Sequence, residues 1–349
     1  SILIHEGTYV FEKTLKIRTG GTEGKWITYL GVGAQQPVLE CGNYVGSGIE
    51  LKEVSYIRVQ NLRVQHVGKT INRTKKLNII RGISLDSCTH IEILDNYLYK
   101  IKNAAIKTMS HRCSNVLIKG NTVEKGCWDE YMDSVEIYRD NKPSMPKGEV
   151  VSINVLDDGE VCYNTVIEGG KESIDIYGCC HRVKVHHNHI YDAVRSNAIY
   201  IDTHWCGQSD IEVYENFIHD IHGNSGIVVN SEDGNMQERV FVHHNVIARV
   251  NGSGIGVNHI NADRDEPSTK WTQDIRVENN TIYETRFDGI ILGGYKKRTN
   301  EQQNVRSITI RNNIICKAAT RDKGGSGIAN RTDLDLEARN IVVENNLLF

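Results

Sequence analysis

Four short stretches of the sequence decide the fold: Ala198-Ile199-Tyr200-Ile201, Gly226-Ile227-Val228-Val229, Gly254-Ile255-Gly256-Val257 and Gly289-Ile290-Ile291-Leu292. Each places apolar residues at its second and fourth positions, which is the period of a β-strand with one buried face. Related stretches recur from residue 48 to residue 330, and an Asn in a short polar turn follows each of them. These residues are Asn61, Asn96, Asn121, Asn164, Asn188, Asn216, Asn245, Asn280, Asn313 and Asn346.

Repetition at this spacing predicts a solenoid, because one unit of short strands cannot bury its inward side chains without neighbours. Asn188, Asn216 and Asn245 should stack along one edge, since Asn tolerates a left-handed backbone and can bond to the Asn above and below. In each Gly-Ile strand, the Ile and the residue two positions later should point inward.

Three of the nine cysteines follow the same register. Cys88, Cys113 and Cys180 each precede an inward Ile or Val by three residues. We expect most thiols to be reduced and buried in the apolar wall, where small side chains pack well. A disulfide between Cys88 and Cys113 is the alternative.

Composition excludes several classes of protein. The 349 residues include 41 Lys+Arg and 44 Asp+Glu, a net charge of -3, whereas a general nucleic-acid binder needs a basic surplus. No apolar stretch approaches the roughly 18 residues of a membrane span, so we expect neither nucleic acid nor membrane as a partner. The sequence opens at Ser1 without Met or a signal peptide, which we interpret as a mature or trimmed chain.

The repeats over 48–349 resemble the right-handed parallel β-helix proteins of the pectate-lyase-like superfold. Residues 1–47, with Glu6-Gly7-Thr8-Tyr9 and Trp26-Ile27-Thr28-Tyr29, look like the leading segment of secreted members. The resemblance implies an all-β solenoid of about ten or more coils: an N-terminal leading segment or cap over 1–47 and one continuous β-helix domain over 48–349. It also implies a carbohydrate-active protein. The sequence has no Gly-His-Gly, and Asp157-Asp158-Gly159 is expected in an insertion, so the resemblance supplies no catalytic residue.

Side chains between the inward ones should form two outward-facing columns on the Gly-Ile strands. Insertions over 67–80, 139–158, 259–274 and 294–306 flank this face and would wall a binding groove, although chance placement also explains them. We expect the substrate-binding residues to be Glu136, Tyr138, Tyr177, Tyr200, His204, Trp205, Asn230 and Asn258.

Three acidic residues, Asp175, Asp202 and Glu232, fall on a diagonal of this face and are the catalytic candidates. Asp175 and Asp202 are the first choice for an acid–base pair, and Glu232 is the substitute for either. Neighbours on the diagonal should be roughly 8 Å apart, which suits a glycosidase that inverts configuration. Glu136 and Asp175 would share a column at about 5 Å, which suits retention. A solvated acidic face and calcium held by Asp175 and Asp202 remain open interpretations; otherwise no cofactor is required.

The aromatic candidates would stack on sugar rings, or they would simply pack between coils. His204 could orient a carboxylate or act as a base, or be an ordinary surface residue. The adjacent pairs His186-His187 and His243-His244 should send their side chains to opposite faces, which favours surface imidazoles over metal ligands. Cys206 near His204 lacks the two further ligands of a zinc site.

Together with the resemblance, which implies a secreted, periplasmic or cell-surface carbohydrate-active protein, these residues predict a glycoside hydrolase acting on a polysaccharide or oligosaccharide. The first alternative is a calcium-assisted polysaccharide lyase, in which Tyr200, His204 or Lys107 would remove a proton from a uronate. The second is a non-catalytic glycan-binding or adhesive β-helix. An acidic groove repels a polyuronate unless a cation neutralises it.

Overall fold

The computed structural model describes residues 1–42, 44–68, 79–128, 148–259, 269–293, 303–320 and 325–349. Their strands form three parallel sheets with 12, 12 and 11 strands, and each coil but the last contributes one strand to each sheet. This is the predicted all-β, right-handed parallel β-helix. The chain forms two compact units, Ser1–Ile174 and Asp175–Phe349.

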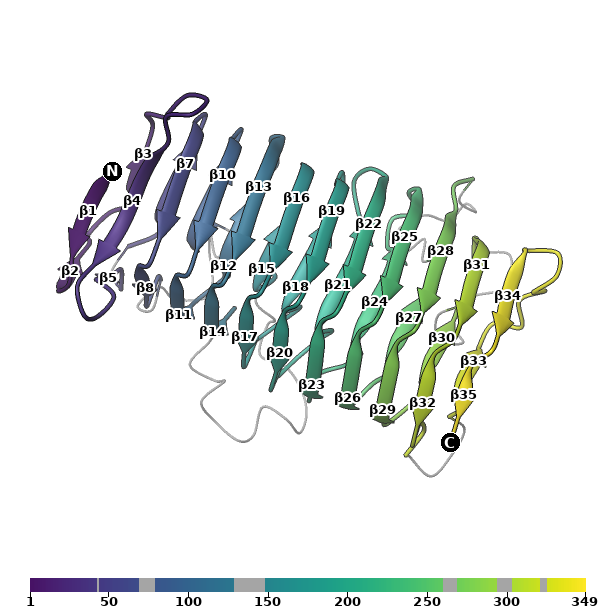
Figure 1. The fold of residues 1–349 in the computed structure, drawn as a ribbon. Coiled ribbons are helices and arrows are strands. Elements are labelled where there is room, and N and C mark those ends of the chain that lie inside the picture. The colour runs from purple at the N-terminus through teal and green to yellow at the C-terminus, as the bar shows by residue number, and fades with distance from the viewer. Residues whose placement is uncertain (43, 69–78, 129–147, 260–268, 294–302, 321–324) are drawn as a thin grey trace. The chain divides into compact units, whose positions relative to one another are not determined.

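The first unit contains the strands of six successive coils (Figure 1). Residues 1–47, predicted as a leading segment, supply β1 to β5 to the same three sheets. One sheet holds β1 (Ile2–His5), β4 (Ile27–Val32), β7 (Ser55–Gln60), β10 (Thr89–Leu94), β13 (Cys113–Lys119) and β16 (Leu156–Cys162). The second holds β2 (Thr8–Val10), β5 (Val38–Glu40), β8 (Arg63–Gln65), β11 (Tyr97–Ile101), β14 (Thr122–Gly126) and β17 (Thr165–Ile167). The third holds β3 (Leu15–Ile17), β6 (Ser47–Lys52), β9 (Arg81–Asp86), β12 (Ala104–Thr108) and β15 (Val151–Ile153).

The second unit repeats the same order of strands. The first sheet holds β19 (His181–His186), β22 (Gln208–Tyr214), β25 (Gln237–His243), β28 (Thr272–Glu278), β31 (Val305–Arg311) and β34 (Ile341–Glu344). The second holds β20 (His189–Tyr191), β23 (Phe217–Ile221), β26 (Val246–Val250), β29 (Thr281–Thr285), β32 (Ile314–Cys316) and β35 (Leu347–Leu348). The third holds β18 (Ile174–Tyr177), β21 (Ile199–Thr203), β24 (Ile227–Ser231), β27 (Ile255–Val257), β30 (Ile290–Leu292) and β33 (Ile328–Asn330).

The inward face of the third sheet follows the predicted pattern. Ile199, Ile201, Ile227 and Val229 are fully buried, and Ile199 pairs with Ile227 in register. Gly begins many of these stretches because the next coil is too close for a side chain: a Cβ on Gly254 would lie 2.6 Å from the Gly289 carbonyl oxygen.

The predicted Asn ladder is confirmed in the second unit. Asn188 Nδ2 donates to Asn216 Oδ1 at 2.9 Å, and Asn216 Nδ2 donates to Asn245 Oδ1 at 2.9 Å. The left-handed backbone, however, is adopted by the residue before each ladder Asn, such as His187 and His244, both with φ of 53°. The Asn supplies the side-chain bonds, and its predecessor makes the turn.

Two register predictions in the first unit are wrong. Asn61 lies one residue before the ladder position, which Leu62 occupies: the Leu62 N–H donates to Asn96 Oδ1 at 3.1 Å. Lys107 of β12 pairs with Ser152 of β15, so Ser152 takes the place predicted for Glu136. Asp157-Asp158-Gly159 is part of β16 and not of an insertion.

Candidate functional site

Strands β21 and β24 position the centre of the candidate site. Asp202 pairs with Asn230, and Tyr200 pairs with Val228, as the two predicted columns require. The Gly178 N–H donates to the Asp202 carbonyl at 2.8 Å, which is the bond expected when Tyr177 precedes Asp202 in its column. The Asn258 N–H likewise donates to Val229 at 2.8 Å and continues that column.

These columns are not the solvent-facing surface that strand alternation predicts. Asp175 and Asp202 are each 1% exposed, and Tyr200 is 8% exposed. Alternation places them on the face opposite the Ile core, but a side chain on that face can still be covered by others. Tyr177 and Asn258 are partly exposed, as are His204 and Glu232 just beyond the columns.

Asp202, His204 and Glu232 converge. Their carboxylate oxygens and imidazole nitrogen include a set that lies within 4.8 Å of one another. The Glu232 N–H donates to Asp202 Oδ1 at 3.2 Å, which ties the turn after β24 to β21. This group joins Asp202 to Glu232 and does not include Asp175, the partner predicted first.

Tyr200 holds Glu232 in this arrangement. Its hydroxyl donates to Glu232 Oε1 at 2.9 Å and accepts a bond from Asn230 Nδ2 at 2.6 Å. Burial, followed by the charges of Asp202 and Glu232, raises the pKa of Tyr200 well above its ordinary value. Tyr200 therefore remains a hydrogen-bond donor, and its role as a proton-abstracting base is disfavoured.

Aromatic rings border the carboxylates. The ring centroid of Tyr177 lies 5.1 Å from that of His204 and 5.3 Å from that of Trp205. Trp205 is 53% exposed, so its ring is available to a ligand. Asp233, which the sequence analysis missed, places Oδ2 3.2 Å from His204 Nδ1. Its signal was the turn Ser231-Glu232-Asp233-Gly234 directly after the strand.

Glu136 and Tyr138, predicted to bind substrate, lie outside the described residues. So do most of the predicted insertions 67–80, 259–274 and 294–306.

The donor set around Asp202 fits calcium poorly. Calcium takes six to eight oxygen ligands, whereas the group has two carboxylates and one imidazole. Such a mixed set suits a transition metal ion better.

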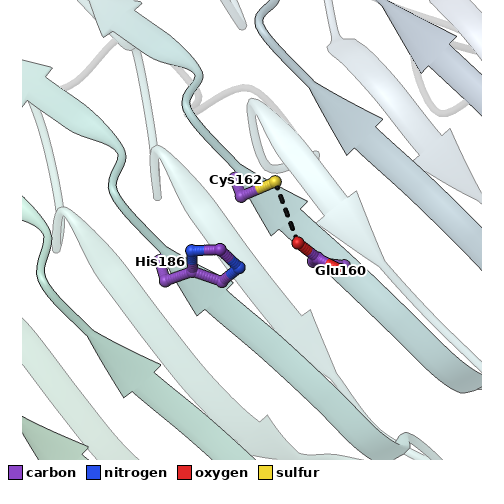
Figure 2. A group of neighbouring side chains, drawn as sticks. All are labelled: Glu160, Cys162 and His186. Carbon is purple, nitrogen blue, oxygen red and sulfur yellow. Dashed lines mark hydrogen bonds between the residues drawn. The ribbon is translucent and has the colours of Figure 1, made fainter.

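One disulfide, Cys179–Cys206, joins the segments that follow Tyr177 and Trp205, with a Cα–Cα distance of 5.3 Å. Cys206 thus has a structural partner that spacing did not reveal. The other seven cysteines form no disulfide and six of them are buried, including Cys88, whose N–H donates to Cys113 Sγ at 3.4 Å. Figure 2 shows Cys162 donating to Glu160 Oε1 at 3.3 Å; burial and this carboxylate raise the pKa of the Cys162 thiol to about 12.

Thiol counting tests this arrangement. Denatured without reductant, the protein should show seven reactive thiols, and after reduction it should show nine. The native protein should show at most one rapidly reacting thiol, because only Cys316 is partly exposed among the free cysteines. A count of one in the denatured, unreduced protein would mean four disulfides and would contradict the structure.

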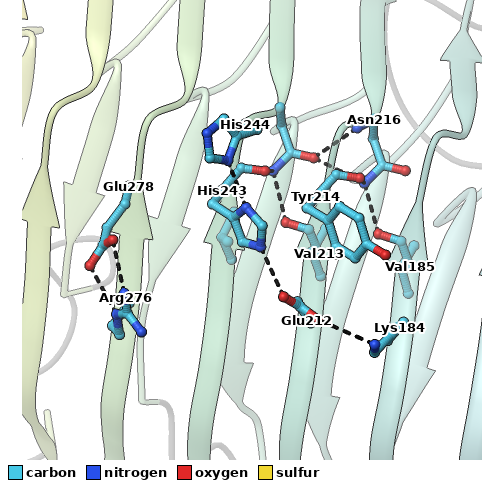
Figure 3. Close-up of polar contacts among 12 residues, drawn as sticks. Lys184, Val185, Glu212, Val213, Tyr214, Asn216, His243, His244, Arg276 and Glu278 are labelled. Carbon is cyan, nitrogen blue, oxygen red and sulfur yellow. Dashed lines mark hydrogen bonds and ion pairs between the residues drawn. The ribbon is translucent and has the colours of Figure 1, made fainter.

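The prediction that adjacent histidines diverge is wrong. His243 Nδ1 lies 2.8 Å from His244 Nδ1 (Figure 3), and His186 Nδ1 lies 2.8 Å from His187 Nδ1. The positive φ of His187 and His244 breaks the strand alternation at this corner, which turns each ring back toward its neighbour.

Comparison with known proteins shows the fold. No family model matches the sequence. Over its whole length the chain is 22% identical to the uncharacterized protein YwoF of Bacillus subtilis strain 168, of which it covers 67%.

Among the described residues, no helix has the length and apolar character of a membrane span.

Solved structures of carbohydrate-active enzymes have a similar fold. The GH136 lacto-N-biosidase of Eubacterium ramulus aligns with a TM-score of 0.61 and 12% identity over 99% of this chain and 61% of that one. The exopolygalacturonase of Thermotoga maritima aligns at 0.56 and 10% identity, covering 92% and 84%. The alginate lyase of Paenibacillus sp. str. FPU-7 aligns at 0.54 and 14%, covering 87% and 91%. With its three parallel sheets, this chain has the fold of the pectate-lyase-like parallel β-helix proteins.

Proposed function

We propose that this protein degrades a polysaccharide or oligosaccharide as a glycoside hydrolase, with Asp202 and Glu232 as its two carboxyl groups. The observation that carries the proposal is the convergence of these carboxylates beside an exposed tryptophan. Hydrolases and a lyase that act on saccharides are among the proteins of similar fold, which supports a carbohydrate as the partner.

Burial favours different roles for the two carboxyl groups. Both accept a hydrogen bond, Asp202 from the Glu232 N–H and Glu232 from the Tyr200 hydroxyl, but only Glu232 is partly exposed, as a group that exchanges protons with water must be. We assign Asp202 as the nucleophile and the partly exposed Glu232 as the acid and then base. Because Asp202 is 1% exposed, the side chains around it must move before a sugar can reach it.

The spacing implies retention of configuration. Reactive oxygens within 4.8 Å resemble the roughly 5–5.5 Å separation of retaining enzymes, whereas inverting enzymes need about 6.5–9.5 Å to admit a water molecule. The proposed pair therefore changes the expected stereochemistry from the inversion predicted for Asp175 and Asp202. Tyr177 and Trp205 would hold the sugar ring by stacking.

The test is an assay on a panel of neutral and acidic polysaccharides that records both new reducing ends and ultraviolet absorbance. We expect reducing ends without absorbance, and nuclear magnetic resonance of the first product should show the anomer of the substrate retained. An inverted product would contradict the Asp202–Glu232 pair. Binding without turnover on every polymer would favour a non-catalytic glycan-binding protein.

A lyase is the second candidate, because the carboxylates of Asp202 and Glu232 could hold a divalent cation beside His204. The cation would neutralise the carboxylate of a uronate, and His204 with Asp233 would be the base in this chain. Products that absorb in the ultraviolet and disappear with chelator would establish this alternative and overturn the hydrolase.

A secreted or cell-surface location belongs to the same proposal. Disulfides persist in oxidising compartments, and the partly exposed Cys179–Cys206 bond supports such a location.

A further inference from the structure

Two histidines on neighbouring strands of the second sheet point their ring tips at one another. His189 lies in β20 and His219 in β23, and their Nε2 atoms are 2.8 Å apart. His189 pairs in register with Phe217, and Tyr191 pairs with His219, so the two imidazoles are diagonal neighbours. They lie on the face opposite the buried Ile190 and Ile218.

The surroundings fix the orientation of His219. Its Nδ1 lies 2.6 Å from Asp220 Oδ2, and Arg249 Nε holds the other carboxylate oxygen of Asp220 at 2.6 Å. An ionised carboxylate only accepts hydrogen bonds, so Nδ1 is the donor in this contact, and a ring with its proton there presents a lone pair at Nε2. Arg249 Nη2 also lies 3.4 Å from this Nδ1. Stacking on Tyr191, with a centroid distance of 5.3 Å and an angle of 4°, keeps the ring plane fixed.

At 2.8 Å, two neutral imidazoles need one proton between them, and His189 Nε2 must supply it. A metal ion can take the place of that proton, since it binds neutral imidazole nitrogens and releases protons on binding. Two nitrogens bound at right angles, each about 2.0–2.1 Å from the metal, are about 2.9 Å apart. The two atoms thus already have the separation of neighbouring ligands. Because the ring tips face one another, each ring must turn by roughly 45° within its own plane before both lone pairs meet at one point beside the axis that joins the two atoms.

We propose that His189 and His219 form a surface site for a divalent transition metal ion of the Ni²⁺ or Cu²⁺ type, with Asp220 orienting His219. Water would complete the coordination. The carboxylate behind a ligating imidazole is the usual outer partner of such sites, because it fixes the tautomer and makes the ring a better ligand. The site is reachable from solvent, since the His219 side chain is 16% exposed and that of Asp220 is 31% exposed. It is independent of the proposed hydrolase.

The pairs His186–His187 and His243–His244 have the same nitrogen separation. The experiment must therefore abolish any Ni²⁺ binding by these two pairs. The exposed rings of these pairs are His187 and His244. The variant His187→Gln/His244→Gln removes one ring from each pair at the surface and serves as the background for all titrations. The untagged protein is titrated with NiCl₂ by calorimetry, because Ni²⁺ does not oxidise the free thiols.

In this background we expect Ni²⁺ binding that weakens at least tenfold in His189→Gln and in His219→Gln. Asp220→Asn should weaken it by about 10- to 100-fold, the usual effect of losing an outer partner. The matched control is His222→Gln, because His222 also faces a carboxylate, Asp192 at 3.4 Å, and should bind Ni²⁺ unchanged. Mg²⁺, which prefers oxygen ligands, should give no heat that depends on His189.

Two results would overturn the proposal. One is Ni²⁺ affinity that is the same in His189→Gln and His219→Gln as in the background, with circular dichroism showing the fold intact. The other is loss of the Ni²⁺ signal in His204→Gln with no change in His219→Gln, which would move the metal to the group around Asp202.

Discussion

Glu232→Gln lowers turnover of the substrate found in the polysaccharide panel by about 100- to 10,000-fold, the range that groups acting in proton transfer contribute. Asp202→Asn removes the nucleophile and lowers turnover at least as far. Both replacements keep the shape of the side chain and remove its charge or its proton. In Asp202→Asn the new amide oxygen can still accept the Glu232 N–H, so the turn after β24 stays in place. Initial rates at saturating substrate measure the effect.

The control for these variants is Asp210→Asn. Asp210 is an exposed carboxylate of the same unit that pairs with Arg239 at 2.7 Å, and its replacement should leave turnover within twofold of the parent. If Asp202→Asn and Glu232→Gln both keep near-normal turnover while circular dichroism is unchanged, the assignment of the carboxyl pair is wrong. Loss that added Ca²⁺ or Mn²⁺ reverses would instead indicate that the cluster binds a cation.

Asn216→Ala should destabilise the protein by about 2–5 kcal/mol, because it leaves several buried polar groups without a partner at about 1–3 kcal/mol each. Asn216 Nδ2 donates to the Val185 carbonyl at 3.0 Å and to Asn245 Oδ1. Its Oδ1 accepts both the N–H and the Nδ2 of Asn188. Ala cannot replace these bonds, and the site is 1% exposed, so water cannot either.

Denaturant unfolding followed by circular dichroism measures this loss, and Asn251→Ala is the matched control. Asn251 also bonds through its amide, to the His222 carbonyl and to Arg286, but both contacts are exposed and water can take over. We expect a change of less than about 0.5 kcal/mol there. Equal midpoints for the two variants would show that the ladder does not stabilise the fold.

The repeats predicted the coils because the inward pattern at Ile199, Ile201, Ile227 and Val229 is imposed by stacking itself. Where two segments fitted the same alternating pattern, the sequence could not show which of them forms the strand. Ser134-Val-Glu-Ile and Val151-Ser-Ile alternate equally well, and only the pairing of Lys107 with Ser152 selects the second. Asn61 was misplaced for the same reason, since a shift of one residue is invisible in a short polar turn.

The candidate site was predictable in its residues but not in its contacts. Strand alternation placed Asp202, Tyr200 and Asn230 on one face, and the structure agrees. Glu232 reaches Asp202 through the turn that follows β24, whose path alternation does not describe. Burial was also beyond prediction, because alternation gives only the side of the sheet. The convergence of His243 and His244 depends on a single positive φ, which no periodicity encodes.

The amide ladder has a consequence for how such a chain can change over evolutionary time. Its Asn residues, here called rungs, are separated by 28, 29, 35, 33 and 33 residues from Asn188 to Asn346. The Nδ2 of each rung nevertheless donates to the Oδ1 of the next. Gain or excision of one whole coil would leave every other rung with an equivalent neighbour, whereas loss of part of a coil would break the row. The lineage can therefore lengthen or shorten in modular steps, and extra residues can accumulate between rungs while the spine is inherited intact.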